Sequence, residues 1–354
     1  MKFTPELLTF SDGEKVVSAA DWQRRREELI DILCREEYGY SPEKPQQVTG
    51  TVVRRAEECC SGHAVLEEIW LSFNTEKGVF HFPIKFFVPK NGRKNPLIIL
   101  INFRPDAYDM YFPIEEIIDS GFAFATVCYQ DITSDDDDMK NGIAGEYARG
   151  EESTAWGKIG MWAFGASRIL DYLETREEVD ASNVAIAGHS RLGKTALWCA
   201  AQDERFRFAI SNDSGCGGAA LEQTKHEGCE SIATMALRFP YWFCQNRHRY
   251  ADKQVARPFD QHFLLAAIAP RFVAVGSASL DAWADPYSEQ LACVAASDAW
   301  EVQGKKGYIG SREPAQTGES FSEGSISYHL RDGIHFMGRS DWLAYMRFIG
   351  RNLK

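Results

Sequence analysis

The chain has 354 residues, of which 44% are hydrophobic and 25% are charged, a composition typical of a globular protein with one or two domains. Its formal net charge of −12 is not offset by any cluster of lysine and arginine, which argues against a nucleic-acid partner. No apolar run reaches the roughly 18 residues of a membrane span, and nine scattered cysteines without a C-x-x-C pair do not support a zinc site.

Residues 1–45 are predicted to form an N-terminal helical extension packed on the main fold. Trp22, Leu29 and Leu33 recur at helical spacing, which predicts a helix over residues 21–38. The basic run 24–26 is flanked by glutamates and is expected to face solvent. The first residues are too few and too polar for a secretory signal, so the expected location is the cytoplasm, or outside the cell if a leader has been removed.

The pattern then changes to strands. Alternating or continuous apolar runs predict strands over residues 65–73, 79–88, 96–102 and 122–128. Helices are expected near 114–118 and over 156–174, so the order of elements indicates a parallel sheet with crossover helices. The aspartate run 135–138 lacks the interleaved ligands and glycine of a calcium loop and is expected to be a solvated loop.

The stretch 184–198 reads as a buried strand, a sharp turn and a helix, with Ser190 at the turn. Hydrolases with a doubly wound sheet present a serine nucleophile in this way, usually with the spacing G-x-S-x-G. Here Gly188 is in place, but the second glycine, Gly193, comes one position late. The alternative is an ordinary strand–helix connection with a capping serine.

Two carboxylates and one histidine are candidates for the partners of Ser190. Asp213 and Asp281 each follow a predicted strand, and the carboxyl ends of parallel strands gather at one edge of a sheet. His335 lies in a loop before the final helix, so the order serine, acid, histidine agrees with hydrolases of this fold. Asp281 follows the next-to-last strand, the usual place of the acid. Both acids can face one imidazole, and the choice stays open. The strand before Asp213 and the loop that follows it are predicted within residues 206–218, the strand before Asp281 over 271–277, and the final helix over 341–349.

Other polar residues near the serine have more than one reading. His262 is expected to be structural because it precedes the Asp281 strand, and His189 is expected to point away from the site. The backbone N–H of Arg191 is the natural first donor to an oxyanion, and its guanidinium could also reach there. Lys194, one turn on, adds positive charge. The alternative is that both cations pair with surface carboxylates.

The stretch Gly188–Lys194 resembles the G-C-S-R-x-G-K nucleophile motif of the glucuronoyl esterases, carbohydrate esterase family 15. The likeness continues in Asp213–Ala220, Phe239–Phe243, Pro258–His262 and Asp281–Pro286, so that it covers nearly the whole chain. The chain departs from the family pattern at His189, which replaces the common cysteine. It also departs at Asp213, which is shorter than the usual glutamate and thereby favours Asp281 as the acid.

The resemblance implies an α/β-hydrolase fold, with a mostly parallel central sheet between two layers of helices. Because no linker is visible, residues 1–354 are expected to form a single domain. The implied reaction is hydrolysis of an ester between a (4-O-methyl-)glucuronate group on xylan and a lignin alcohol, without metal or organic cofactor. Ser190 would be the nucleophile and His335 the base, and Arg191 would help hold the oxyanion. The implied contacts to the sugar hydroxyls are Lys194, Trp283 and Glu230.

Two other functions remain open from the sequence. One is an esterase of the same fold that removes acetyl groups from xylan or oligosaccharides. The other is a catalytically silent hydrolase-fold protein that binds saccharides. The sequence does not indicate an oligomeric state.

Overall fold

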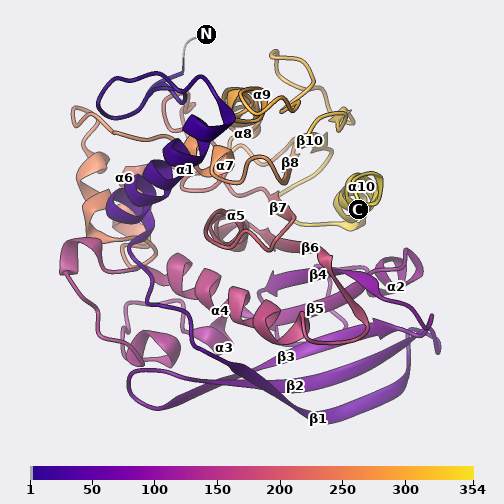
Figure 1. Cartoon of the computed structure of the whole chain (residues 1–354). Helices are drawn as coiled ribbons and strands as arrows, with labels where there is room; N and C mark the ends of the chain where they lie inside the picture. Colours follow the sequence, from indigo (N-terminus) through magenta and orange to yellow (C-terminus); the bar gives the residue numbers. More distant parts are fainter. Residues whose placement is uncertain (1–2) are drawn as a thin grey trace.

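Figure 1 shows a computed structural model of the chain, which describes residues 3–354. Within these residues, ten strands form one sheet in the order β1-β2-β3-β5-β4-β6-β7-β8-β10-β9. The strands are β1 (Val48–Cys59), β2 (Ala64–Asn74), β3 (Val79–Pro89), β4 (Asn95–Asn102), β5 (Ala123–Cys128), β6 (Val179–His189), β7 (Phe208–Asn212), β8 (Phe272–Ala278), β9 (Ser320–Phe321) and β10 (Ile326–Arg331).

The sheet has an antiparallel part and a parallel part. Strands β1, β2 and β3 pair antiparallel, and β3 pairs antiparallel with β5. From β5 through β4, β6, β7 and β8 to β10, every neighbouring pair is parallel. The strands predicted over 65–73, 79–88, 96–102 and 122–128 are confirmed as β2 to β5. They could be predicted because a strand buried on both faces is a continuous apolar run, whereas a half-buried strand alternates apolar and polar residues.

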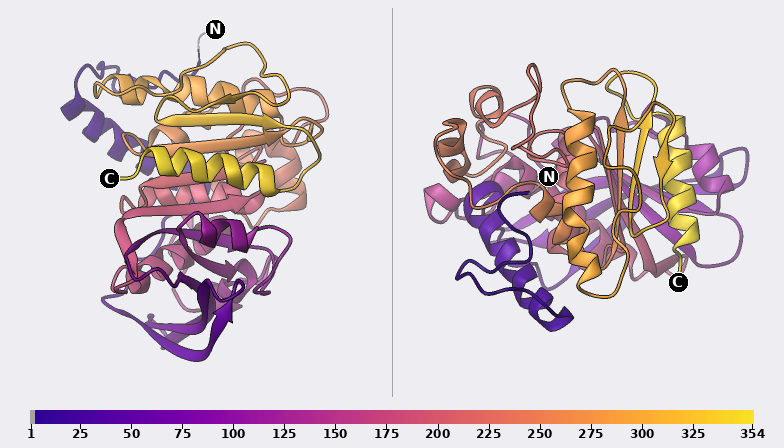
Figure 2. Two further views of the ribbon diagram at one scale, coloured as in Figure 1. Left: turned by 90° about the vertical axis from the view of Figure 1, so that its right-hand side faces the viewer. Right: turned by 90° about the horizontal axis from the view of Figure 1, so that it is seen from above.

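Helices cover both faces of the sheet, and they lie on opposite sides of it in Figure 2. On one face α4 and α5 pack against each other and α5 lies on β6 and β7, with α8 on β8 and β10; on the other face α2 contacts β3 and β5, and α10 contacts β7, β8 and β10. This arrangement confirms the α/β class with three layers. The helices are α1 (Ala19–Leu33), α2 (Ile114–Asp119), α3 (Tyr129–Ile132), α4 (Lys158–Leu173), α5 (Arg191–Gln202), α6 (Ile232–Arg238), α7 (His262–Ala266), α8 (Pro286–Ala296), α9 (Asp298–Glu301) and α10 (Arg339–Arg351). A π-helical segment, η1 (Cys34–Tyr38), follows α1, and the short 3-10 helices are η2 (Gly142–Gly145), η3 (Glu152–Thr154) and η4 (Gln245–Ala251).

The N-terminal helix α1 joins the main core. Its apolar stripe, which includes Trp22 and Leu29, is buried, and the helix packs against α7. The expectation that the basic run faces solvent is wrong for Arg25 and Arg26, which are buried. Arg25 Nε donates to the Leu7 carbonyl at 3.0 Å, and Arg26 donates to the carbonyls of Ala267 and Ala201 at 2.8 and 2.7 Å. These guanidinium groups satisfy backbone acceptors that burial would otherwise leave without a partner.

The parallel strands β4 to β8 and β10 all end at the same edge of the sheet. Ser190 follows β6 directly, Asp213 follows β7, and Asp281 and His335 lie three and four residues beyond β8 and β10. Ligands and chemistry gather at this edge in open α/β sheets. Within the residues that the structure describes, no helix is both long and apolar enough to cross a membrane.

Candidate active site

Ser190 occupies a tight turn between β6 and α5, as the sequence predicts. Its φ of +58° and ψ of −127° are strained for a non-glycine residue, and its N–H donates to the Asn212 carbonyl at 2.8 Å. A Cβ on Gly188 would lie 2.0 Å from the Leu192 carbonyl oxygen, so only glycine allows α5 to fold back over β6 here. A Cβ on Gly193 would lie 3.0 Å from Ser214 Cβ. The absence of a side chain at Gly193 therefore lets α5 lie close to the loop that follows β7.

His335 is held by Asp281. The imidazole Nδ1 donates to Asp281 Oδ2 at 2.5 Å, and Asp281 Oδ1 also accepts from the Ala284 N–H at 3.3 Å. Asp281 is buried, whereas 39% of the His335 side chain is exposed. A buried carboxylate on Nδ1 fixes the tautomer, which leaves Nε2 as the nitrogen that can accept a proton from a serine.

Asp213 lies nearby but is bonded to other groups. Its Oδ1 accepts from the Ala278 N–H at 2.8 Å and its Oδ2 from Arg331 Nη2 at 3.4 Å. His189 Nδ1 lies 3.9 Å from Oδ2. Burial, and then the charges of Glu289 and Asp281, raise the pKa of Asp213 well above its usual range. Of the two candidate acids, Asp281 is thus the one that contacts His335.

Arg191 begins α5, and its guanidinium pairs with Asp135 and lies 4.7 Å from the ring centroid of Trp242. Asp135 also accepts from the Tyr129 hydroxyl at 3.0 Å and from Trp242 Nε1 at 2.8 Å. The expectation of a solvated aspartate run is therefore wrong for Asp135, whose side chain is 7% exposed. The side-chain role of Arg191 at an oxyanion stays a prediction. Its backbone N–H belongs to the first turn of α5, where N–H groups lack intrahelical acceptors.

Lys194, Glu230 and Trp283 come together, although they lie far apart in the sequence. Lys194 is buried, and its Nζ donates to Glu230 Oε2 at 2.8 Å and to the Ser214 and Cys216 carbonyls at 2.5 and 2.7 Å. The Glu230 N–H donates to the Trp283 carbonyl at 2.9 Å. Trp283 is 37% exposed, and the Arg238 guanidinium lies 5.7 Å from its ring centroid, so a partly exposed aromatic ring lies beside a buried cation–carboxylate pair. Such a combination is suited to a hydroxylated ring.

These residues and their spacing agree with known proteins. The family described as fungal glucuronyl esterase matches residues 71–304 of the chain. The chain belongs to the glucuronoyl esterase family. Members of this family are carboxylic ester hydrolases that use a Ser-His-acid triad, and the resemblance read from the motifs is thereby confirmed.

Relatives of this glucuronoyl esterase cover almost its whole length. It is 32% identical to carbohydrate esterase MZ0003 from an unknown prokaryotic organism, over 99% of this chain and 90% of that protein. The 4-O-methyl-glucuronoyl methylesterase of Phanerochaete carnosa is 28% identical over 85% of this chain and 72% of its own length. Among solved structures, a glucuronoyl esterase from Solibacter usitatus superposes with a TM-score of 0.90 at 33% identity, covering 99% of this chain and 97% of that one. These structures confirm the α/β-hydrolase fold.

The sequence-based expectation is wrong for one histidine at this edge of the sheet. The expectation that His189 points away is wrong, because its ring lies against His335 with centroids 4.4 Å apart. Its Nδ1 contacts Asn212 Oδ1 at 2.7 Å, and burial, followed by the charge of His335, lowers the pKa of His189 to about 3. It is therefore neutral wherever the enzyme is folded near neutral pH. His262, in contrast, is buried away from this edge with Nε2 at 3.0 Å from the Pro5 carbonyl, which agrees with a structural role.

Arg331 and Glu289 hold the loops around the site through hydrogen bonds. Neither residue lies in a sequence motif that would predict this role. Arg331 Nη2 donates to the carbonyls of Ile334, at 2.9 Å, and Phe336, the two neighbours of His335, while Nε donates to Asp341 Oδ2 at 2.7 Å. Buried Glu289 accepts from the N–H groups of Ser214 and Gly215 at 2.8 and 3.0 Å and from Ser277 Oγ at 2.6 Å. Only the packed structure brings these partners together.

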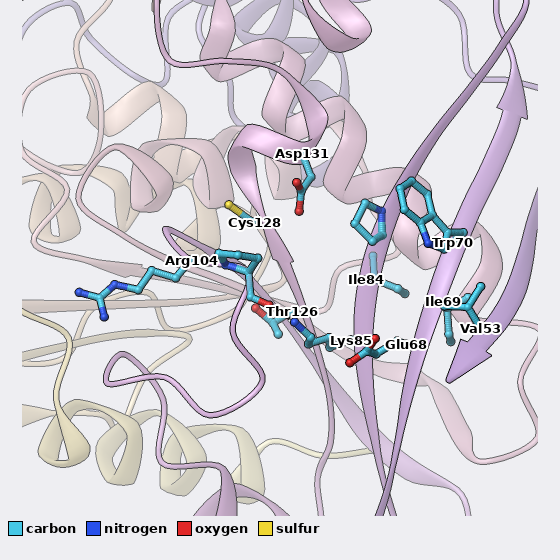
Figure 3. Close-up of a pocket in the computed structure, with 12 residues that line it drawn as sticks. Val53, Glu68, Ile69, Trp70, Ile84, Lys85, Arg104, Thr126, Cys128 and Asp131 are labelled. Atoms are coloured by element: carbon cyan, nitrogen blue, oxygen red, sulfur yellow. Dashed lines mark hydrogen bonds between the residues drawn. The ribbon is translucent and has the colours of Figure 1, made fainter. Parts of the chain in front are cut away.

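A separate small cavity lies beside β2, β3 and β5 (Figure 3). It has a volume of about 80 Å³, and its lining includes Trp70, Lys85 and Asp131. None of the predicted site residues lines it. The candidate active site is therefore the carboxyl edge of the sheet around Ser190 and not this cavity.

Proposed function

We propose that this chain hydrolyses esters of glucuronate or 4-O-methyl-glucuronate, with Ser190 as the nucleophile. The observation that carries the proposal is the combination of a serine elbow and a His335–Asp281 pair with the Lys194–Glu230 pair one helical turn away. Curated relatives over most of the chain are named 4-O-methyl-glucuronoyl methylesterases, which supports this acyl group.

The proposed reaction has two half-reactions. His335 takes the proton of Ser190 as Oγ attacks the ester carbonyl, and Asp281 stabilises the imidazolium that forms. The N-terminus of α5, with the Arg191 N–H, lies where the oxyanion develops. The tetrahedral intermediate collapses, the alcohol leaves with a proton from His335, and a glucuronoyl ester of Ser190 remains. Water then attacks this ester while His335 takes a proton from it, and His335 passes that proton to Ser190 Oγ as the acyl–oxygen bond breaks and the free acid leaves.

Recognition of the sugar is assigned to the second group of residues. The partly exposed Trp283 ring gives a flat apolar surface for the sugar, and Glu230 offers a carboxylate acceptor for its hydroxyls. The Lys194 ammonium already donates to three protein acceptors, namely Glu230 and two backbone carbonyls of the loop after β7. Its contribution is therefore to hold Glu230 and that loop in place.

The test is turnover of benzyl and methyl glucuronate by the purified protein. Ser190→Ala is expected to lower kcat by about 10³-fold or more, because the residual rate then comes from binding and the oxyanion donors alone. Ser182→Ala, an exposed serine in the same strand, is the matched control and should leave kcat unchanged. Retained turnover in Ser190→Ala would contradict the assignment of the nucleophile.

A second candidate is favoured by one relative. A structure 32% identical to this chain, with a TM-score of 0.90, is described as a promiscuous esterase of the same family from a marine bacterial metagenome. Acetylated xylo-oligosaccharides are therefore the second substrate to test. Cleavage of acetyl groups without cleavage of glucuronate esters would overturn the proposed acyl group. No cleavage of either ester and no labelling by a fluorophosphonate, with saccharide binding retained, would indicate a silent saccharide-binding protein.

A further inference from the structure

A second cluster of reactive side chains lies outside the catalytic residues. His226 and Cys229 belong to the loop between β7 and α6, and Asp285 precedes α8. One potential ligand atom from each, an imidazole nitrogen, a thiol sulfur and a carboxylate oxygen, lies within 4.8 Å of the other two. His226 Nδ1 and Asp285 Oδ1 are 3.0 Å apart.

These three atoms form a donor set with a clear chemical preference. Nitrogen, sulfur and oxygen ligands together suit Zn²⁺, whereas Mg²⁺ and Ca²⁺ select oxygen alone. With bonds of about 2.0–2.3 Å, the ligands of a tetrahedral zinc lie roughly 3.3–3.8 Å apart, so small side-chain movements suffice here. A thiolate and a carboxylate carry two negative charges, which a divalent ion neutralises.

The surroundings combine a rigid ligand with open access. Asp285 is buried, and Ser288 holds it through the hydroxyl at 2.7 Å and the N–H at 3.2 Å. His226 and Cys229 line a cavity of about 700 Å³, which leaves room for entry of an ion and for water as a fourth ligand. All nine cysteines lie in the described residues, and Cys229 is the one that is partly exposed, while the other eight are buried.

The neighbouring cation Lys225 does not exclude an ion. Its Nζ is buried without a hydrogen-bond partner in the described residues, and Glu222 is the strongest of the charges acting on it. Among the charged neighbours of Glu222, Lys225 has the largest effect in lowering the pKa of that carboxyl group. Asp285 and Glu230 also act on Lys225, so the ammonium charge is shared among three carboxylates, of which Glu222 contributes most.

We propose that His226, Cys229 and Asp285 bind one Zn²⁺ ion, with water as the fourth ligand. The ion joins the loop after β7 to the segment before α8. Glu230 and Trp283 lie one residue after Cys229 and two residues before Asp285, and they are already joined by a backbone hydrogen bond of 2.9 Å. The site is therefore a clamp across the two segments that bear the proposed sugar contacts. It takes no part in the chemistry of Ser190.

The test is titration of the metal-free full chain with Co²⁺ and then Zn²⁺. We expect one equivalent of Co²⁺ to produce a thiolate-to-cobalt charge-transfer band, and Zn²⁺ to abolish it. Saturating Zn²⁺ should raise Tm by about 3 °C or more, because the ion binds only the folded chain. Cys229→Ser should remove the band and weaken Zn²⁺ binding by about 100-fold or more.

Two variants separate this site from others. His335→Ala removes one ligand from the other group of possible ligands, which is His189, Asp213 and His335, and should keep the band. His63→Ala removes an exposed His–Asp pair of similar geometry, 2.9 Å from Nδ1 to Oδ1, and should keep it as well. Absence of the band in the folded wild type, or its survival in Cys229→Ser, would overturn the proposal. Esterase activity is not a readout of this test, so its outcome is independent of the proposed function.

Discussion

At the scale of single residues, the two candidate acids differ in what surrounds them. Asp281 faces His335 at 2.5 Å and is bonded otherwise to one backbone N–H. Asp213 is more deeply buried, and its two oxygens accept from a backbone N–H and from Arg331. Because burial raises the pKa of Asp213 well above its usual range, it is a poor permanent anion for an imidazolium.

We therefore predict that Asp281→Asn lowers kcat for benzyl glucuronate by about 10²–10⁴-fold, because an amide no longer stabilises the imidazolium and favours the wrong tautomer. Asp213→Asn, which resembles the protonated acid, should lower kcat by less than about tenfold. Steady-state kinetics of both variants checks the ranking. The reverse order would assign the triad acid to Asp213.

Arg331 is predicted to be a positioning residue for the base. Its guanidinium brackets His335 through the carbonyls of Ile334 and Phe336, so Arg331→Met should lower kcat by about 10–100-fold with little change in KM. The control is Arg339→Met, an exposed arginine whose partner is Glu116, and its kcat should be unchanged. A rise in KM at constant kcat would contradict a role in holding His335.

At the scale of elements, Glu289 of α8 joins the ends of two strands. It accepts hydrogen bonds from the loop that follows β7 and from Ser277 near the end of β8. Burial raises its pKa to about 7, despite these donors. Because an unfolded glutamate has a pKa of about 4.3, the native chain binds more protons than the unfolded chain between those values.

The consequence is a pH-dependent contribution to stability. The contribution of Glu289 is fully present below about pH 4.3 and declines as pH rises through about 7, by up to about 3 kcal/mol. Glu289→Gln keeps an acceptor and a donor but does not titrate. The free energy of unfolding of the wild type should thus fall relative to that of the variant as pH rises over this window, as measured by urea unfolding. A difference that does not vary with pH would show that Glu289 stays ionised.

At the scale of the whole molecule, the N-terminal helix is part of the core. Trp22 is fully buried between α1 and the main fold, so Trp22→Ala should lower the free energy of unfolding by about 3–5 kcal/mol, while kcat at a temperature where the variant is folded should stay unchanged. Trp70→Ala is the control, because Trp70 is 39% exposed and its loss should change stability by less than about 1 kcal/mol. Denaturant unfolding with parallel kinetics checks both. A separable extension would leave stability unchanged in Trp22→Ala.

The sequence alone determined the local features of this protein. Apolar runs predicted the central strands, and the strand–turn–helix around Ser190 follows from Gly188, whose missing Cβ makes room for the Leu192 carbonyl. Ser190, the candidate acids and His335 were predicted to lie at one edge of the sheet, because each follows a strand and parallel strands end on the same side. Local pattern carries this information since it depends on backbone geometry and periodicity.

Only the tertiary structure decided which side chains meet. The sequence left Asp281 and Asp213 as alternatives, and the pairing with His335 depends on loops from two different strands. It placed His189 outside the site and the basic run of α1 in solvent, whereas packing buried His189, Arg25 and Arg26 and gave each a hydrogen-bond partner. Long-range contacts of this kind leave no periodic signal, because a buried polar side chain is chosen to match partners that lie far away along the chain.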